Sequence, residues 1–147
     1  MAAPEHPIPG LPEALELVGD RWTLLVIAAL LDGPRRFGDL QQEVHGIAPN
    51  VLTQRLRALT ADGLVIASAY TQRPPRYVYE LSAAARELEP ALTLLAGWGA
   101  GHGSGTQAPR HEACGTPLEL RWWCPVCREP AADVAEPPGS DEDLHYA

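Results

Sequence analysis

Three polar side chains recur at helical spacing in the middle of the chain and have the chemistry to recognise bases. Asn50, Gln54 and Arg57 share one face of a predicted helix, with Thr53 beside them. An amide can make two hydrogen bonds to an adenine edge, and a guanidinium two to a guanine edge. The opposite face carries three leucines, Leu52, Leu56 and Leu59. The polar row therefore predicts a nucleic-acid contact, the alternative being the solvated face of an ordinary core helix.

A second set of residues has the spacing of a metal site. His111, Cys114, Cys124 and Cys127 form the pattern H-x2-C-x9-C-x2-C, which contains all three cysteines of the chain. Two such pairs supply the four ligands of tetrahedral Zn²⁺, and so short a segment would fold together with its metal. We expect one structural zinc ion. The alternatives are a redox pair of Cys124 and Cys127 or unligated thiols, and His102 could substitute for His111.

Charge is distributed unevenly along the chain. The net charge is −8, which by itself disfavours nucleic acid, but residues 35–76 hold six arginines and three acidic residues. Residues 111–147 hold two arginines and eight acidic residues. All eleven basic residues are arginine, a side chain suited to bidentate contacts with phosphates and bases. The basic middle is therefore the segment expected to meet DNA.

Length and composition exclude several classes of protein. The 147 residues, 46% of them apolar, suit one domain with an appendage. No apolar run reaches the roughly 18 residues of a membrane span, and residues 1–10 lack the basic segment of a signal peptide. We expect a cytoplasmic protein with no membrane partner. The sequence offers no nucleophile–base pair or phosphate loop in a plausible pocket, so we do not expect an enzyme.

Two helices are predicted near the N-terminus. Pro12 opens the first, whose apolar stripe includes Ala14, Leu15 and Val18. Asp20 is a good N-cap for the second, Arg21–Leu31. The second helix is apolar nearly all round, which indicates burial in the core or against a second subunit.

The polar row lies on the second member of a predicted helix pair. A short helix over Arg35–Val44 is followed by a turn at Gly46 and by the helix of about residues 48–61, with Gly63 at its C-terminal exit. Two short helices joined by a glycine turn are typical of a helix-turn-helix motif.

The pattern changes after Gly63 to one typical of strands. Leu64–Tyr70 and Arg76–Leu81 predict a two-stranded hairpin, and its tip at about residues 71–76 carries prolines and arginines. Such a hairpin directly after a helix-turn-helix is a wing. Ser82 then caps a predicted last helix that ends at about Gly97.

The run from Ala14 to Trp98 carries a series of motifs in a specific order. They are Gly19–Thr23, Leu31–Gly33, Arg36–Leu40, Gly46-Ile47, Leu52–Leu59, Asp62–Val65, Pro74–Leu81 and Leu95–Gly99. In order and spacing this series resembles the HxlR family of bacterial winged helix-turn-helix regulators. The resemblance implies a homodimeric regulator that binds double-stranded DNA, with the recognition helix in the major groove and the wing on the flanking backbone.

Eight residues are expected to contact DNA. They are Arg36, Asn50, Thr53, Gln54, Arg55, Arg57, Arg73 and Arg76. Arg36 stands at a helix start, which favours phosphate. Two assignments stay open. Arg55 either reaches a phosphate or pairs with Asp62 or Glu43, and Arg76 is either a DNA contact or a cross-strand partner within the hairpin.

The resemblance does not extend to a redox mechanism. Several family members sense oxidants through a cysteine followed by proline before the first helix, and the matching dipeptide here is Ile8-Pro9. Four apolar residues, Trp22, Leu92, Leu95 and Trp98, are expected to form either a pocket for a small-molecule effector or the core of the dimer.

The expected fold class is mainly α with a two-stranded β-wing, plus a small C-terminal metal-knuckle appendage. The expected segments are an irregular arm (1–12), the winged DNA-binding and dimerisation domain (13–99), a flexible linker (100–110), a zinc-ribbon-like appendage (111–130) and an acidic, disordered tail (131–147). A zinc- or thiol-responsive sensor and a protein-interaction adaptor are the alternatives to a simple DNA-binding regulator.

Overall fold

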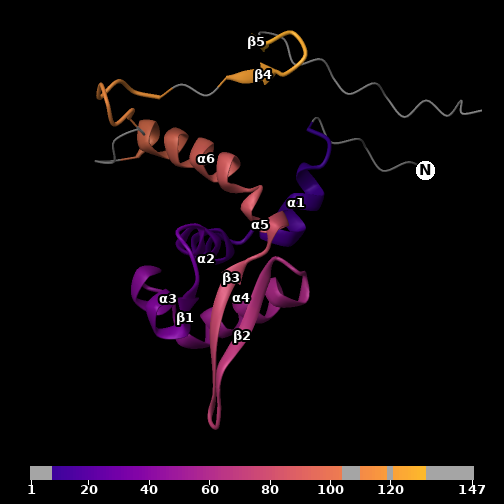
Figure 1. Cartoon of the computed structure of the whole chain (residues 1–147), viewed down its shortest axis with the longest axis vertical. Coiled ribbons are helices and arrows are strands. Elements are labelled where there is room, and N and C mark those ends of the chain that lie inside the picture. Colours follow the sequence, from indigo (N-terminus) through magenta and orange to yellow (C-terminus); the bar gives the residue numbers. More distant parts are fainter. Residues whose placement is uncertain (1–7, 104–109, 119–120, 132–147) are drawn as a thin grey trace, which may run out of the picture. The chain divides into compact units, whose positions relative to one another are not determined.

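The computed structural model describes residues 8–103, 110–118 and 121–131 of the chain (Figure 1). It divides into two compact units, residues 1–96 and 97–147. The predicted arm, linker and acidic tail lie partly outside the described residues, and the predicted segment limits stay predictions. None of the described helices is both long and apolar enough to cross a membrane.

The first two helices follow the predicted caps. Helix α1 spans Leu11–Val18 and begins one residue before the predicted Pro12. Helix α2 spans Arg21–Leu31 as predicted. The Asp20 carboxylate accepts hydrogen bonds from the backbone N–H groups of Trp22 (2.9 Å) and Thr23 (3.2 Å), which satisfies two of the otherwise unpaired donors at the start of α2.

The helix-turn-helix is present, with a shorter first helix than predicted. Residues Arg35–Arg36 form a strand, β1, and helix α3 spans Phe37–Glu43. Gly46 turns the chain with φ of 83°, as expected for a tight turn. Helix α4 spans Pro49–Ala61, and Gly63, which follows it, has the left-handed φ of 70° that the sequence predicted for the exit from this helix.

The wing belongs to a three-stranded sheet, so the predicted two-stranded wing is wrong in this respect. Strands β2 (Val65–Gln72) and β3 (Pro75–Leu81) form the hairpin, and the antiparallel order is β1-β3-β2. In β1, Arg35 pairs with Tyr79 and Arg36 with Val78. A two-residue strand carries too little alternation to be seen in a sequence, and its extended backbone is fixed by pairing with β3.

The predicted last helix is interrupted. Helix α5 spans Ala83–Arg86, with the Ser82 hydroxyl accepting from the N–H of Ala85 at 3.3 Å, and helix α6 spans Glu89–His102. Pro90 explains the break, because it has no N–H to give to the carbonyl of residue 86 and its ring would clash there. The second helix also continues five residues past the predicted end at Gly97.

The core lies between the helices and one face of the sheet. Leu52, Leu56 and Leu59 of α4 are at most 2% exposed. Their partners from α2, α3 and the sheet are Val26, Ile27, Leu30, Leu40, Val65 and Leu81. Arg86 of α5 donates to the carbonyl oxygen of Leu31 at 3.2 Å, which ties α5 to the C-terminal end of α2. The leucine face of α4 is therefore buried in the core, as the spacing of the leucines predicted.

In the second unit, the described residues after α6 form two turns and a hairpin. Strand β4 spans Trp122–Cys124 and pairs antiparallel with β5, Glu129–Ala131. An isolated bridge joins Arg110 to Pro117. Trp123 and Val126 are 60% and 89% exposed, so these side chains contribute little to any core.

Candidate functional site

Helix α4 presents the predicted polar row to solvent. Asn50, Gln54 and Arg57 are all exposed, on the side opposite the buried leucines. Thr53 is half-buried beside them, and its hydroxyl donates to the carbonyl oxygen of Pro49 at 2.8 Å. Because the leucine face is locked into the core, the helix cannot rotate, and the row keeps a fixed orientation.

A groove of about 580 Å³ runs between α4 and the sheet. We call it the α4 groove. It is lined by Phe37, Thr53, Leu56, Arg57, Thr60, Ala61, Ala67, Tyr77 and Tyr79. Burial, together with the nearby Tyr77, raises the pKa of Tyr79, and the Arg57 charge opposes this rise. Tyr79 is therefore a neutral hydroxyl donor beside a permanent positive charge.

A second groove of about 450 Å³, here the α3 groove, is bordered by the same two tyrosines. It is lined by Arg36, Phe37, Gly38, Asp39, Tyr70, Pro75, Arg76, Tyr77 and Tyr79. The two grooves share Phe37 and the two tyrosines of β3. Four of the predicted DNA-contacting residues thus border one continuous surface, namely Arg36, Thr53, Arg57 and Arg76.

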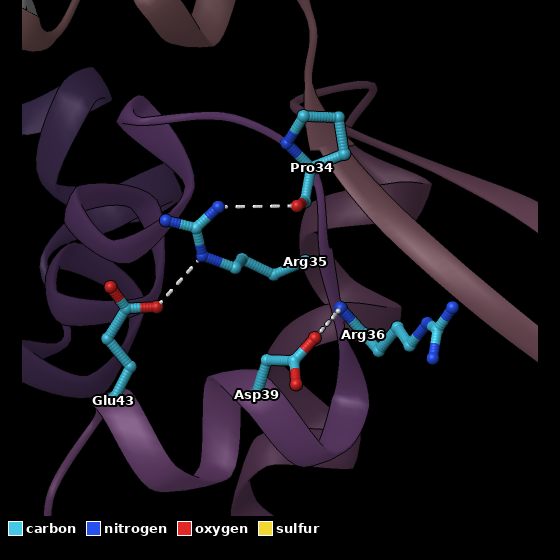
Figure 2. A network of polar contacts seen from close by, with 5 residues as sticks. All are labelled: Pro34, Arg35, Arg36, Asp39 and Glu43. Atoms are coloured by element: carbon cyan, nitrogen blue, oxygen red, sulfur yellow. Dashed lines mark hydrogen bonds and ion pairs between the residues drawn. The ribbon is translucent and has the colours of Figure 1, made fainter.

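The two arginines of β1 have different surroundings (Figure 2). The Arg35 Nε donates to the Glu43 carboxylate at 3.1 Å, and its Nη1 lies 3.4 Å from the carbonyl oxygen of Pro34. The Arg36 backbone N–H donates to the Asp39 carboxylate at 3.1 Å, which caps α3, but its guanidinium points away from both carboxylates. Among the described residues, Arg36 has no ion-pair partner, so its charge is available to a ligand.

The guanidinium of Arg36 instead lies over an aromatic ring. Its carbon is 4.9 Å from the centroid of Tyr70 in β2. A cation–π contact of this kind holds the side chain in place without neutralising its charge. Tyr70 is not among the predicted site residues, because the contact joins residues 34 positions apart and no local pattern reveals it.

Arg55 lies on the interior side of α4, and its ion-pair partner is Asp20, which was not among the predicted partners. Its Nε lies 3.3 Å from the Asp20 carboxylate, so it pairs with neither Asp62 nor Glu43 in the described structure. The same Asp20 oxygen accepts the two N–H groups that cap α2. The geometry is an ion pair in which the Arg55 Nε–H does not donate a well-directed hydrogen bond. Arg55 therefore links the recognition helix to α2.

The wing tip carries the remaining two predicted DNA contacts. Arg73 and Arg76 are both exposed, and the Thr71 hydroxyl donates to the carbonyl oxygen of Pro74 at 2.7 Å within the turn. The cross-strand neighbour of Arg76 is Thr71. Since that neighbour is uncharged, the pairing leaves the positive charge of Arg76 uncompensated.

Tyr77 and Thr60 also border the α4 groove but were not among the predicted site residues. Tyr77 is 42% exposed, and its ring centroid is 6.4 Å from that of Tyr79. A usable signal was present in the sequence, because Tyr77 and Tyr79 are two residues apart in a predicted strand and so share one face. Thr60 also had a signal, because it follows Arg57 by three residues in the predicted helix and so lies on the same face.

The four residues predicted to form an effector pocket or dimer core differ in exposure. Trp22 and Leu92 pack against the core of the first unit. Leu95 and Trp98 are 52% and 63% exposed. Arg21 lies 4.2 Å from the centroid of the Trp22 ring. The structure therefore does not place all four in the same environment, and their proposed roles stay predictions.

The four predicted metal ligands occur as two local pairs. The His111 Nδ1 lies 3.3 Å from the Cys114 sulfur, and the N–H of Cys127 donates to the Cys124 sulfur at 3.4 Å. Within residues 8–103, 110–118 and 121–131, no three His, Cys, Asp or Glu side chains lie close enough together to hold a metal ion. The four-ligand zinc site therefore stays a prediction.

Hydrogen bonds to sulfur stabilise the thiolate forms of Cys114 and Cys124. Contacts with the side chain and backbone of Thr116, and a weaker one with His111, lower the pKa of Cys114. The backbone N–H groups of Cys127 and Val126, followed by the Cys127 thiol, lower the pKa of Cys124.

Comparison with known proteins identifies the winged unit. The sequence profile of the HxlR-like helix-turn-helix family matches residues 17–107. The chain is 39% identical over 132 residues to the uncharacterised HTH-type transcriptional regulator Rv3095 of Mycobacterium tuberculosis, covering 86% of this chain and 83% of that protein. It is 40% identical over 88 residues to the HTH-type transcriptional regulator YtcD of Bacillus subtilis, covering 60% of this chain and 70% of YtcD.

Solved structures show the same fold. The redox regulator HypR in its oxidised form matches with a TM-score of 0.59 and 30% identity, over 65% of this chain and 98% of HypR. The reduced form of the transcriptional regulator YodB from B. subtilis matches with a TM-score of 0.56 and 26% identity, over 66% of this chain and 95% of YodB. With its helix-turn-helix, three-stranded wing sheet and matching sequence, the chain belongs to the HxlR-like helix-turn-helix family of DNA-binding transcriptional regulators.

Proposed function

We propose that the protein recognises its DNA sites through the exposed row of α4, which enters the major groove. The observation that carries this proposal is the orientation of α4, whose leucine face is buried while Asn50, Gln54 and Arg57 are exposed. Two amides and a guanidinium supply the bidentate base contacts that distinguish sequences. Thr53, at the border of the α4 groove, adds a shorter polar side chain to the same surface.

Arginines around the two grooves are proposed to bind phosphates. Arg36 and Arg76 border the α3 groove, and neither has an acidic partner among the described residues. Arg73 at the wing tip is exposed and extends this basic surface toward the flanking backbone. Phosphate contacts fix the register of the protein on DNA and account for most of the salt dependence of binding. The net charge of −8 does not oppose this, because residues 111–147, with two arginines and eight acidic residues, account for −6 of it.

The active form is proposed to be a homodimer. Exposed apolar side chains occur on three helices of the first unit, Leu15 and Leu17 of α1, Leu25 of α2, and Leu94 and Leu95 of α6, each between 45% and 54% exposed. Several exposed apolar side chains are typical of an interface, and a symmetric dimer buries the same residues on both chains. A dimer would also present two recognition helices to the two halves of a palindromic operator.

The winged unit, residues 1–96, contains no cysteine, so we propose no thiol-based redox response through it. HypR is described as a redox regulator, and YodB has been studied after diamide treatment. In this chain the three cysteines all lie between residues 114 and 127, and Ile8-Pro9 is the dipeptide that the resemblance matches to the family's cysteine–proline pair. A thiol-based response of this protein would have to begin in the C-terminal segment.

The test is selection of bound duplexes from a random-sequence pool, followed by affinity measurements on the selected site. Arg57→Gln and Gln54→Ala are each expected to weaken binding by about 1–3 kcal/mol and to relax the preference at one base position. Arg86→Gln is the matched control, because Arg86 is exposed but donates to the carbonyl of Leu31 on α2. Enrichment of no sequence, or equal losses for all three variants, would contradict the proposal.

A further inference from the structure

The C-terminal segment contains the same chain turn twice. In the first, the N–H of Gly115 donates to the carbonyl oxygen of His111 at 2.7 Å. In the second, the N–H of Arg128 donates to the carbonyl oxygen of Cys124 at 2.8 Å. Each turn spans five residues, and its first and fourth residues are potential zinc ligands. The fifth residue has a left-handed backbone in both, with φ of 68° at Gly115 and 56° at Arg128.

The second turn requires an uncommon backbone conformation at Arg128. Arg128 is the one non-glycine residue with positive φ among the residues that the structure describes. That region is uncommon for side chains other than Gly, Asn and Asp, and it persists only where the surrounding structure demands it. Here it closes the turn that brings the N–H of Cys127 to 3.4 Å from the Cys124 sulfur. An N–H pointing at a cysteine sulfur stabilises the thiolate that a metal requires.

The donor atoms of the first turn are already at ligand spacing. The His111 Nδ1 and the Cys114 sulfur are 3.3 Å apart. With Zn–S of about 2.3 Å and Zn–N of about 2.0–2.1 Å at a tetrahedral angle, the corresponding nitrogen–sulfur edge is about 3.6 Å. A shift of a few tenths of an ångström would therefore allow both atoms to bind one ion.

The apolar side chains that the structure describes in this segment form no core that could hold it together. Leu118, Trp123 and Val126 are 55%, 60% and 89% exposed. A stretch of about twenty residues cannot bury enough surface to fold alone, and small domains of this kind usually depend on a metal or on disulfides. An odd number of cysteines leaves at least one thiol outside any internal disulfide. A metal uses all three cysteines and the histidine.

From these observations we infer that His111, Cys114, Cys124 and Cys127 together bind one Zn²⁺ ion that joins the two turns into a single knuckle. Each turn presents two donors, and a closed structural zinc site takes four. Three thiolates and an imidazole favour zinc over calcium or magnesium, which prefer oxygen ligands. With four protein ligands the ion has no open position, so its role is to fold the segment. This inference goes beyond DNA binding and does not depend on it.

The first experiment measures metal in the purified full-length protein by elemental analysis. We expect about one zinc ion per chain and little iron. Replacement of zinc by Co²⁺ should give the visible absorption of a tetrahedral thiolate site, a signature that surface-bound metal does not produce. A thiol reagent should react slowly with the loaded protein and rapidly with all three cysteines once a chelator is present.

Single-ligand variants identify the site. Cys124→Ser and His111→Asn are each expected to reduce the zinc content to near zero or to weaken retention against a chelator by at least tenfold. His102→Asn is the matched control, since His102 is an imidazole of the same unit whose Nδ1 lies 2.8 Å from the Trp98 carbonyl oxygen. It should retain full zinc content. Circular dichroism and DNA retention confirm that the winged unit remains folded in every variant.

Three results would overturn the inference. The first is zinc-free protein after purification in zinc-containing buffer without chelator. The second is zinc content that is unchanged in Cys124→Ser and His111→Asn. The third is a Cys124–Cys127 disulfide in protein isolated under reducing conditions, which would identify a redox pair. Because none of these results concerns operator binding, each leaves the proposed DNA contacts standing.

Discussion

Two adjacent arginines in β1 provide a comparison within one strand. Arg35 is held by Glu43 at 3.1 Å, while the Arg36 guanidinium rests on Tyr70 without an acidic partner among the described residues. The two side chains differ in partners and not in type. If a variant of Arg36 weakens DNA binding and the same variant of Arg35 does not, the unpaired charge of Arg36 is needed for DNA binding.

We expect Arg36→Gln to weaken DNA binding and to lower the slope of log affinity against log salt concentration by about 0.9, the value for one phosphate contact. Arg35→Gln should leave the slope unchanged and alter stability by less than about 1 kcal/mol, since its ion pair is partly exposed. A fluorescence-anisotropy titration over a range of salt concentrations measures both. Equal slopes for Arg36→Gln and the unmodified protein would remove Arg36 from the interface.

Asp20 has two roles that can be separated by substitution. Its carboxylate caps α2 and pairs with Arg55 of the recognition helix at 3.3 Å. Asp20→Asn retains a capping oxygen but loses the charge, whereas Asp20→Ala loses both. The asparagine variant should lose at most about 1 kcal/mol of unfolding free energy. The alanine variant should lose a further 0.5–2 kcal/mol, roughly the value of an N-cap.

Urea denaturation of the two Asp20 variants measures these free energies. If the cap has no role, the two variants will be equally stable. If the ion pair with Arg55 orients the recognition helix, Asp20→Asn will also weaken operator binding although the fold is retained. An unchanged operator affinity would limit the pair to a minor contribution to stability.

At the scale of elements, the two faces of α4 are expected to respond differently to truncation. Leu52 is fully buried, so Leu52→Ala should lower the unfolding free energy by about 2–5 kcal/mol. Gln54 is exposed, so Gln54→Ala should change stability by less than about 0.5 kcal/mol while weakening sequence-specific binding. Denaturation curves and affinities of the folded fraction would be measured on the same preparations. A large stability loss in Gln54→Ala would mean that the polar row has a structural role.

Most of the helical framework could be predicted because its signals are local. The Asp20 cap, the leucine spacing of α4 and the exits at Gly46 and Gly63 each lie within a few residues of the feature they determine. The break before α6 was also encoded locally, by Pro90, and was missed because the apolar pattern continues across it. Strand β1 could not be foreseen, since a two-residue strand exists only through its pairing with Tyr79 and Val78 of β3.

The candidate site was predicted less completely than the framework. The exposed row of α4 follows from helical periodicity, but the grooves beside it depend on how β3 packs against α4 and α3. The Arg55–Asp20 pair joins residues 35 positions apart, and the Arg36–Tyr70 contact spans a similar separation. Such partners are set by tertiary packing. Sequence spacing could place Arg55 toward the interior but could not choose among the nearby carboxylates.

At the scale of the whole molecule, the exposed leucines of α6 test the proposed dimer. Leu94→Gln/Leu95→Gln is expected to shift the protein from dimer toward monomer, because polar amides in the interface would lose hydrogen bonds to water. Ile66→Gln is the matched control, since Ile66 is 47% exposed but lies on β2 of the wing sheet. Analytical ultracentrifugation measures the mass. A monomeric unmodified protein would contradict the proposal directly.

A dimer also makes a geometric prediction about the operator. Its two recognition helices are held at a fixed separation, so the two half-sites should lie about 10–10.5 base pairs apart, or a multiple of this, centre to centre. Inserting about half a helical turn moves one half-site to the opposite side of the duplex, and the rigid contacts of α4 with the core do not allow the helix to follow it. Affinity should then fall to that of a single half-site, and the Leu94→Gln/Leu95→Gln variant should not distinguish the two duplexes. If the insertion leaves the affinity of the unmodified protein unchanged, its two recognition helices do not bind the operator as one unit.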